Sequence, residues 1–300
     1  MRKPEVTILT PTYNRVHLLP DLYKSLNEQT MMNFEWLIID DGSTDATEDA
    51  VRNFNDNGFT IEYVKKENGG KHTALNYAHP YINGKLVFIV DSDDTLTRDA
   101  VETIIAQYTK DENQDDIACW SFLKSTSRLL QESGIGKSEV VVSNYVDYRI
   151  NGHRTGDYAE VVRTDVFKKY SFPVIQGEKF MLESWLWNQM AQDGYKTVYV
   201  NKAVYIYEYL EDGLTRRARG LRMKNPQGAM IDAKQYLLNP NVCRLVKLKT
   251  MVLFWIYGFS AKEKVIDIAK KSGNSRTMLA FLPIGYIAYR IWNKKYLLRK

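Results

Sequence analysis

Short apolar runs alternate with helix-patterned segments through the first 110 residues of this chain. The apolar runs, which predict β-strands, are residues 6–10, 36–39, 61–64 and 86–90. The segments that predict helices after them are residues 18–27, 44–54, 74–78 and 97–107. Strands that alternate with helices are typical of an α/β sheet with parallel strands. The chain is therefore expected to bind its ligands beyond the carboxyl ends of these strands.

A polar cluster follows each predicted strand. The four clusters are Pro11-Thr12-Tyr13-Asn14-Arg15, Asp40-Asp41-Gly42-Ser43, Glu67-Asn68-Gly69-Gly70-Lys71 and Asp91-Ser92-Asp93-Asp94. Because parallel strands end at the same edge of a sheet, one edge should collect all four clusters. The pattern predicts a single polar site there.

The acids at 91, 93 and 94 come directly after the apolar run 86–90. Carboxylates at the end of a buried strand must be solvated, paired or bound to a metal. Mg²⁺ and Mn²⁺ take oxygen ligands and keep positions open for water and substrate phosphate. The acids therefore predict a divalent-cation site for a phosphorylated substrate such as a nucleotide diphosphate. For an Asp-x-Asp triplet taken alone, a solvated turn is the alternative.

Two common phosphate-binding classes are excluded by the loops after the strands. No G-x-G-x-x-G follows the first strand, and no G-x-x-x-x-G-K-[ST] occurs. A sugar-phosphate nucleotidylyltransferase would need a glycine-rich loop after the first strand, and residues 11–15 contain no glycine. Phosphate should instead be bound by a metal and by side chains such as Lys71 or Arg15.

The order and spacing of the four clusters resemble the family 2 glycosyltransferases, which are inverting enzymes of GT-A fold: a Rossmann-like mixed sheet with helices on both faces. The resemblance implies that a nucleotide-sugar is bound by Thr10, Pro11, Tyr13, Asn14, Arg15, Asp41, Asn68, Gly70, Lys71, Asn76, Asp91 and Ser92. In this set Tyr13 would stack near the base, and Asp41 would accept a hydrogen bond from uracil, which favours UDP donors. Mg²⁺ or Mn²⁺ would be held by two of Asp91, Asp93 and Asp94, and which two is left open.

An inverting transfer needs a base for the acceptor hydroxyl. The resemblance places this base just before a short helix that contains Leu186 and Trp187, and it implies Glu183, with Glu178 as the alternative. The family's frequent Glu-Asp doublet is absent, because Leu182 stands before Glu183. For either glutamate, an ordinary helix-start carboxylate is the non-catalytic interpretation. Without a base the chain would be a non-catalytic nucleotide-sugar binding module.

Motifs at 156–165, 172–180 and 207–215 resemble the acceptor half of bacterial surface-polysaccharide members of the family. Residues 211–215 would form a loop over the donor diphosphate, with Thr215 and Arg216 near phosphate; a solvated basic turn is the alternative. The resemblance implies a catalytic domain at 1–220, divided into a nucleotide-sugar-binding half at 1–110 and an acceptor half at 111–220. The implied acceptor is a glycan or lipid-linked oligosaccharide of cell-surface polysaccharide synthesis.

Charge sets the remaining residues, 221–300, apart as a basic, aromatic helical extension. The whole chain has 41 Lys and Arg against 36 Asp and Glu, a net charge of +5. Residues 244–300 carry 13 Lys and Arg against two acids, so their net charge is 13 − 2 = +11. The apolar runs 251–257 and 278–289 are shorter than the roughly 20 residues that span a bilayer. They predict helices that lie on an anionic membrane surface, with packing on the catalytic core as the alternative.

Two further features bear on location and partners. Only two cysteines occur, and Met1-Arg2-Lys3-Pro4 leads into a strand instead of a hydrophobic leader. We therefore expect a cytoplasmic protein that is peripherally associated with the inner face of the plasma membrane. Nucleic acid is not an expected partner, because the basic segment contains no recognisable nucleic-acid-binding motif.

Overall fold

The computed structural model describes residues 3–126, 140–154, 156–207 and 214–298. The chain divides into two compact units, each built from separate stretches of sequence. Unit 1 comprises Met1–Asn144, Thr155–Ser171 and Gly194–Tyr209, and unit 2 comprises Tyr145–Arg154, Phe172–Asp193 and Leu210–Lys300.

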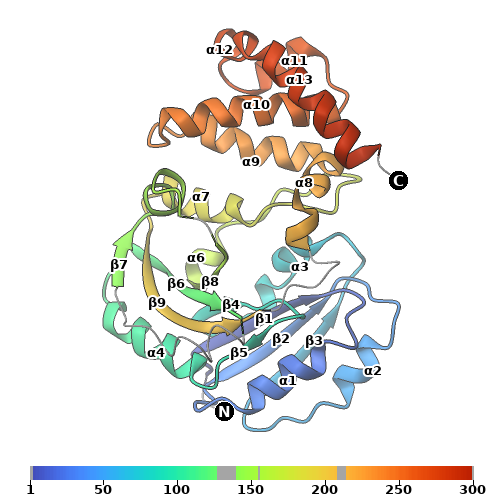
Figure 1. Cartoon of the computed structure of the whole chain (residues 1–300). Coiled ribbons are helices and arrows are strands. Elements are labelled where there is room, and N and C mark those ends of the chain that lie inside the picture. The colour runs from blue at the N-terminus through green and yellow to red at the C-terminus, as the bar shows by residue number, and fades with distance from the viewer. Residues whose placement is uncertain (1–2, 127–139, 155, 208–213, 299–300) are drawn as a thin grey trace. The chain divides into compact units, whose positions relative to one another are not determined.

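The described part of unit 1 contains a nine-stranded mixed sheet (Figure 1). Its strands are β1 (Val6–Thr12), β2 (Phe34–Asp40), β3 (Thr60–Lys65), β4 (Leu86–Ile89), β5 (Thr95–Leu96), β6 (Ile117–Ser125), β7 (Val140–Ser143), β8 (Tyr158–Arg163) and β9 (Lys196–Ile206). Their order is β3-β2-β1-β4-β8-β6-β9-β5, and β7 pairs with β9. The strands β1 to β4, which the sequence predicted, pair with one another in parallel. The strand β8 runs antiparallel to both of its neighbours, β4 and β6. The predicted α/β class and the mixed sheet are confirmed.

Helices cover both faces of this sheet. They are α1 (Leu19–Asn27), α2 (Thr47–Arg52), α3 (Lys71–Tyr77), α4 (Ala100–Asp111) and α6 (Thr164–Phe167), with a short 3₁₀ turn, η1 (His79–Tyr81). Leu22 of α1 packs with the strand residues Ile8 and Trp36 in one core. Side chains alternate along a strand, so Leu9 faces the other side. There α3 packs on β1 and β2, opposite α1 and α2 (Figure 1).

Two predicted helices of unit 1 begin three residues later in the structure than the sequence predicts. The helix predicted at 44–54 begins only at Thr47, because the backbone N–H groups of residues 43–45 bind Asp40 and Asn14 instead of forming a helical turn. The helix predicted at 97–107 covers Ala100–Asp111. It starts later because the backbone N–H of Thr97 donates to Val204 of β9, at 3.0 Å.

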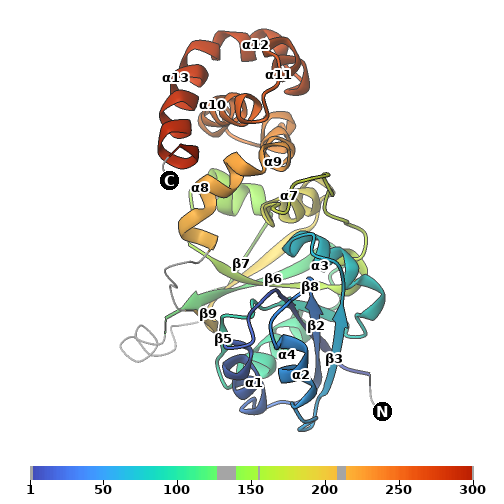
Figure 2. The same ribbon diagram turned by 90° about the vertical axis from the view of Figure 1, so that its right-hand side faces the viewer.

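Unit 2 is helical. It contains α7 (Ser184–Gln192), α8 (Leu214–Lys224), α9 (Pro226–Leu238), α10 (Arg244–Ser260), α11 (Val265–Lys271), α12 (Ser275–Ala280) and α13 (Leu282–Trp292), with π-helical turns at η2 (Val146–Asn151) and η3 (Asn293–Leu297). In Figure 2, α10 lies between α9 and α13. Gly285 allows the close approach of α13 to α10, because a Cβ there would lie 2.4 Å from Cβ of Trp255. The predicted helical C-terminal region is confirmed, and none of the described helices is both long enough and apolar enough to span a bilayer.

Candidate functional site

Asn14 connects the carboxyl ends of β1 and β2. Its backbone has a φ of 53°, a left-handed conformation in which Asn is enriched. Its side-chain oxygen accepts hydrogen bonds from the backbone N–H groups of Thr44, at 2.8 Å, and Asp45, at 3.3 Å. Its own N–H donates to the Ser43 hydroxyl at 2.8 Å. Asn14 thus shapes the turn after β2, whereas the neighbouring Tyr13 is 46% exposed at this edge.

Asp41 organises the loop that follows β3. One carboxylate oxygen accepts from Lys66 Nζ at 2.5 Å and from the Gly69 N–H at 2.9 Å. The other accepts from the Gly70 N–H at 2.6 Å and from Asn68 Nδ2 at 3.1 Å. A carboxylate offers about four acceptor positions, so protein donors fill them all. The uracil contact stays a prediction, and it would require one of these donors to be exchanged for the base.

Lys71 links this loop to the acids at the end of β4. It is the first residue of α3, and its Nζ donates to an oxygen of Asp91 at 2.5 Å. Arg15, from the loop after β1, also interacts electrostatically with Asp91 and Asp93. The structure therefore brings together side chains that follow all four predicted strands.

The three acids after β4 differ in their electrostatics. Burial opposes ionisation of Asp91, but the charges of Lys71 and Lys124 outweigh it and keep the pKa of Asp91 below its usual value. Burial and the nearby charge of Asp91 raise the pKa of Asp93, and they raise the pKa of Asp94 to about 7. A bound cation would reduce the electrostatic repulsion between these crowded carboxylates.

The described residues do not form a complete protein cage for a metal, since no three His, Cys, Asp or Glu side chains among them are suitably grouped. The acids after β4 fit instead a cation such as Mg²⁺, which retains water and substrate oxygens among its ligands. The donor set at Asp91, Asp93 and Asp94 is chemically suited to it, because all of its ligand atoms are carboxylate oxygens.

Tyr205 and Lys124 are two members of this site that sequence reasoning missed. The buried Tyr205 hydroxyl donates to Asp94 at 2.7 Å and accepts from the Asp91 backbone N–H at 2.9 Å. Lys124 Nζ lies 3.9 Å from the centre of the Tyr205 ring. These residues come from β9 and β6, at least 30 positions beyond the acids in sequence. Neither residue stands out in its strand sequence from the residues around it, so nothing local indicates a role at the site.

The remaining predicted donor-site residues of unit 1 are placed as follows. Thr10 is buried, and its hydroxyl accepts from the Trp36 indole at 3.0 Å. Pro11 and Ser92 are also buried, and Asn76 lies in α3. Their contacts with a nucleotide-sugar stay predictions.

The two candidate bases, Glu178 and Glu183, belong to unit 2. The carboxylate of Glu178 accepts from the backbone N–H groups of Gln227 and Gly228, both at 2.8 Å. These N–H groups belong to the first turn of α9, so Glu178 caps that helix. Glu183 is half-buried at the residue before α7. The capping contacts of Glu178 favour Glu183 as the candidate base.

The loop predicted at 211–215 is only partly described. Residues 211–213 lie outside the described residues. The loop prediction is wrong for Leu214 and Thr215, which begin α8 together with Arg216. The helix is consistent with the Arg-rich sequence of this segment, since arginine favours helices. Phosphate contacts of Thr215 and Arg216 stay predictions.

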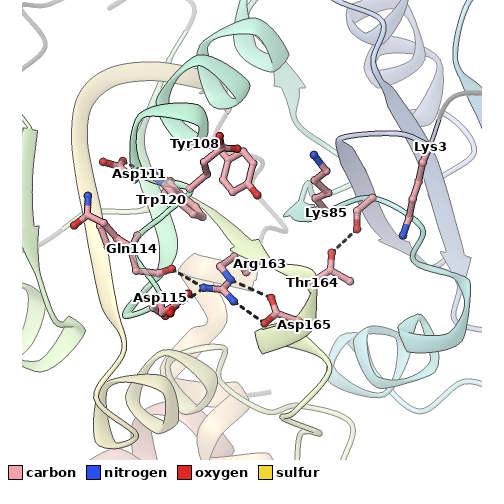
Figure 3. A pocket seen from close by; sticks show the side chains of 13 residues that line it. Lys3, Lys85, Tyr108, Asp111, Gln114, Asp115, Trp120, Arg163, Thr164 and Asp165 are labelled. Atoms are coloured by element: carbon pink, nitrogen blue, oxygen red, sulfur yellow. Dashed lines mark hydrogen bonds and ion pairs between the residues drawn. The ribbon is translucent and has the colours of Figure 1, made fainter.

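A pocket of about 400 Å³ lies at the opposite edge of the sheet, beside the start of β4 (Figure 3). Several of its polar groups pair with one another. Arg163 binds Asp165 through two hydrogen bonds, at 2.7 and 3.0 Å, and Trp120 donates to Asp111 at 3.0 Å. No residue of the four predicted clusters lines this pocket, and we assign it no role in the reaction.

The fold defines a class of protein. A crystal structure of TarS from S. aureus, residues 1–349 in complex with UDP-GlcNAc, matches with a TM-score of 0.65 at 19% identity, over 97% of this chain and 91% of that chain. The mannosyltransferase PcManGT from Pyrobaculum calidifontis, in complex with GDP-Man and Mn²⁺, matches with a TM-score of 0.60 at 19% identity, over 99% and 86%. These likenesses show a GT-A fold.

The sequence comparisons identify the family. Residues 7–172, more than half of the chain, match the sequence profile of Glycosyl transferase family 2, so the chain belongs to this family. One relative is the UDP-Glc:alpha-D-GlcNAc-diphosphoundecaprenol beta-1,3-glucosyltransferase WfgD from Escherichia coli, which is 28% identical over 186 residues, 60% of this chain and 68% of that protein. Three other curated relatives are much longer, and the matches span only 12% to 32% of their length.

Proposed function

We propose that this chain is an inverting, metal-dependent glycosyltransferase that transfers a sugar from a UDP-sugar to a glycan or lipid-linked oligosaccharide of bacterial cell-surface polysaccharide synthesis. The convergence of Arg15, Lys71 and the acids after β4 at one sheet edge carries this proposal. We assign catalysis to residues 1–220, with donor recognition in 1–110.

Within this proposal the residues have distinct tasks. Two of Asp91, Asp93 and Asp94 would hold Mg²⁺ or Mn²⁺, which stabilises the negative charge of the departing diphosphate when it is bound. Lys71 and Arg15 bring positive charge to the same place. Tyr13 offers an exposed ring for the base. The UDP-GlcNAc in the TarS complex and the Mn²⁺ in the PcManGT complex support the donor class and the metal.

Glu183 would act as the base. It would accept the proton of the acceptor hydroxyl while that oxygen attacks the anomeric carbon and the bond to the diphosphate breaks. No covalent enzyme intermediate is needed for this single displacement. The name of WfgD, a transferase that acts on a diphosphoundecaprenol-linked sugar, supports a lipid-linked acceptor for this chain as well.

Release of UDP from UDP-glucose and UDP-N-acetylglucosamine, with glycan and lipid-linked acceptors, tests the reaction. We expect Glu183→Gln to abolish release while UDP still binds. Asp193→Asn is the matched control, because this exposed acid lies at the other end of α7. UDP binding by the wild type without release from any donor would support the non-catalytic binding module instead, and full activity of Glu183→Gln would remove it as the base.

Ligand-induced stabilisation tests the donor and the metal. UDP together with Mn²⁺ or Mg²⁺ should raise the melting temperature more than UDP alone, and Asp93→Asn should remove most of this metal-dependent gain. Equal stabilisation by GDP would contradict the UDP assignment. Equal stabilisation by UDP without metal would contradict the cation site.

A membrane surface is the proposed partner of the C-terminal helices. On α13, Ile284, Ile287 and Ile291 are 56%, 61% and 60% exposed. Their spacing places them on one helical face, which Lys294 and Lys295 of η3 extend. Apolar side chains beside cations suit the headgroup region of an anionic leaflet. This surface would support association with the inner face of the plasma membrane.

Co-sedimentation with phosphatidylglycerol and phosphatidylcholine vesicles tests the membrane partner. The wild type should bind the anionic phosphatidylglycerol vesicles and dissociate from them at high salt. Ile287→Asp should weaken binding at least tenfold. Val174→Asp, which changes a 67% exposed valine of unit 2 outside the C-terminal helices, should not. Equal recovery of wild type and Ile287→Asp with anionic vesicles would contradict the proposed surface.

A further inference from the structure

Residues 178–184, the segment that carries both candidate bases, are hydrogen-bonded to α9 and its N-cap residue within unit 2. Glu178 caps the first turn of α9, and the backbone N–H of Lys179 donates to the side-chain oxygen of Asn225 at 2.8 Å. Gly228 makes this contact close, since a Cβ there would lie 3.1 Å from the backbone oxygen of Phe180. The start of the segment therefore cannot shift without moving α9.

The far end of the segment is held by a buried carboxylate. Ser184, the residue after Glu183, donates its hydroxyl hydrogen bond to Asp232 Oδ1 at 2.9 Å. Asp232 is only 7% exposed and lies in the middle of α9. Burying an ionisable group is costly, and burial raises the pKa of Asp232 to about 6. A neutral side chain would fill this place at lower cost.

We propose that Asp232 is a positioning residue for Glu183: by accepting from Ser184, it fixes the start of α7 and with it the backbone from which Glu183 projects. This inference rests on the proposed function, in which Glu183 is the base. A base must lie within hydrogen-bond reach of the acceptor hydroxyl. Displacement of a reacting group by about 1 Å can cost up to about 100-fold in rate. The contact with Ser184 would prevent such a displacement.

Three variants distinguish the effect of the hydrogen bond between Ser184 and Asp232 from the effect of the negative charge of Asp232. Ser184→Ala removes the donor and Asp232→Ala removes the acceptor. Asp232→Asn keeps an oxygen that can accept from Ser184 but removes the charge. We expect the first two to lower kcat about tenfold or more, with the KM for the UDP-sugar and the Kd for UDP within twofold of wild type. Asp232→Asn should restore kcat to within about threefold of wild type.

Ser260→Ala is the matched control, because this serine of α10 donates to Ile256 of its own helix, at 2.9 Å. It should leave kcat unchanged. Activities are expressed per UDP-binding site, so loss of folded protein does not count as loss of kcat. Wild-type kcat in Ser184→Ala and Asp232→Ala would overturn the positioning role, as would an Asp232→Asn variant as slow as Asp232→Ala.

The same assay includes Glu183→Gln, which separates this inference from the proposed function. If Glu183→Gln is inactive while Ser184→Ala is fully active, Glu183 is the base but Asp232 does not position it. If Glu183→Gln is fully active, the assignment of the base fails, and the positioning role fails with it.

Discussion

Replacement of Asp232 by Asn should stabilise the protein at neutral pH. Burial raises the pKa of the Asp232 carboxyl group from 3.8 to about 6, although Ser184 and Arg222 oppose this rise. Burial also raises the pKa of Tyr236 and Tyr257, two phenols near Asp232 that therefore stay uncharged between pH 5 and about 8. At neutral pH the folded protein thus keeps a negative charge at a place that disfavours it.

The magnitude follows from the pKa shift. The folded state binds the proton of Asp232 more tightly than the unfolded chain does. This tighter binding stabilises the folded protein, and the stabilisation is fully present below the pKa of Asp232 in the unfolded chain. That stabilisation is lost as the pH rises through the folded pKa of about 6. The difference between a pKa of 3.8 and one of about 6 corresponds to about 3 kcal/mol of unfolding free energy. Relative to wild type, Asp232→Asn should therefore gain up to about 3 kcal/mol at pH 7.5 and roughly half of that at pH 5.

Urea unfolding at the two pH values measures this difference. Four of the six tryptophans, at 185, 187, 255 and 292, belong to unit 2, so their fluorescence reports mainly on the unit that contains Asp232. The control is Asp193→Asn, an exposed acid whose replacement should change the unfolding free energy by less than about 0.5 kcal/mol. A lower stability of Asp232→Asn than of wild type at pH 7.5, or an equal gain at both pH values, would refute the reasoning.

Three further substitutions test other contacts. Tyr205→Phe leaves the backbone N–H of Asp91 and an oxygen of Asp94 without their partner, and should cost about 1–3 kcal/mol in urea unfolding. Asp41→Ala leaves two loop N–H groups without their acceptor and removes one acceptor of Lys66, so that loop should show at least tenfold faster hydrogen exchange. Glu178→Ala removes the cap of α9 and should cost about 1–2 kcal/mol in urea unfolding, whereas an unchanged midpoint would show that water replaces the cap.

The parallel half of the fold and the meeting of its polar clusters were predictable from the sequence. Helices separate these strands from one another along the chain, so direction and edge follow from local patterns alone. The pairing of Lys71 with Asp91 is a consequence of that arrangement. The sequence therefore predicted that the four polar clusters form one site without any knowledge of contacts between distant parts of the chain.

The contacts that complete the site were not predictable in this way. Tyr205 reaches Asp94 across 111 positions of sequence, because β9 enters the sheet beside β6 and pairs with β5. Glu178 caps a helix that begins about 50 positions later. Pairings over such separations depend on the folded topology and leave no local signal in composition or periodicity. For the same reason, sequence patterns alone did not show that Asn14 and Asp41 shape their neighbouring loops.

The position of β9 within the sheet has a consequence for folding during synthesis. The parallel strands β1 to β4 are complete once residue 89 has left the ribosome, and they can pair from then on. The strand β9, in contrast, is flanked by β6, β5 and β7, and it ends at residue 206. Until then, β6 presents an open edge to the surroundings of the nascent chain. Slow translation before residue 196 should therefore promote aggregation of this chain, whereas slow translation after residue 206 should not.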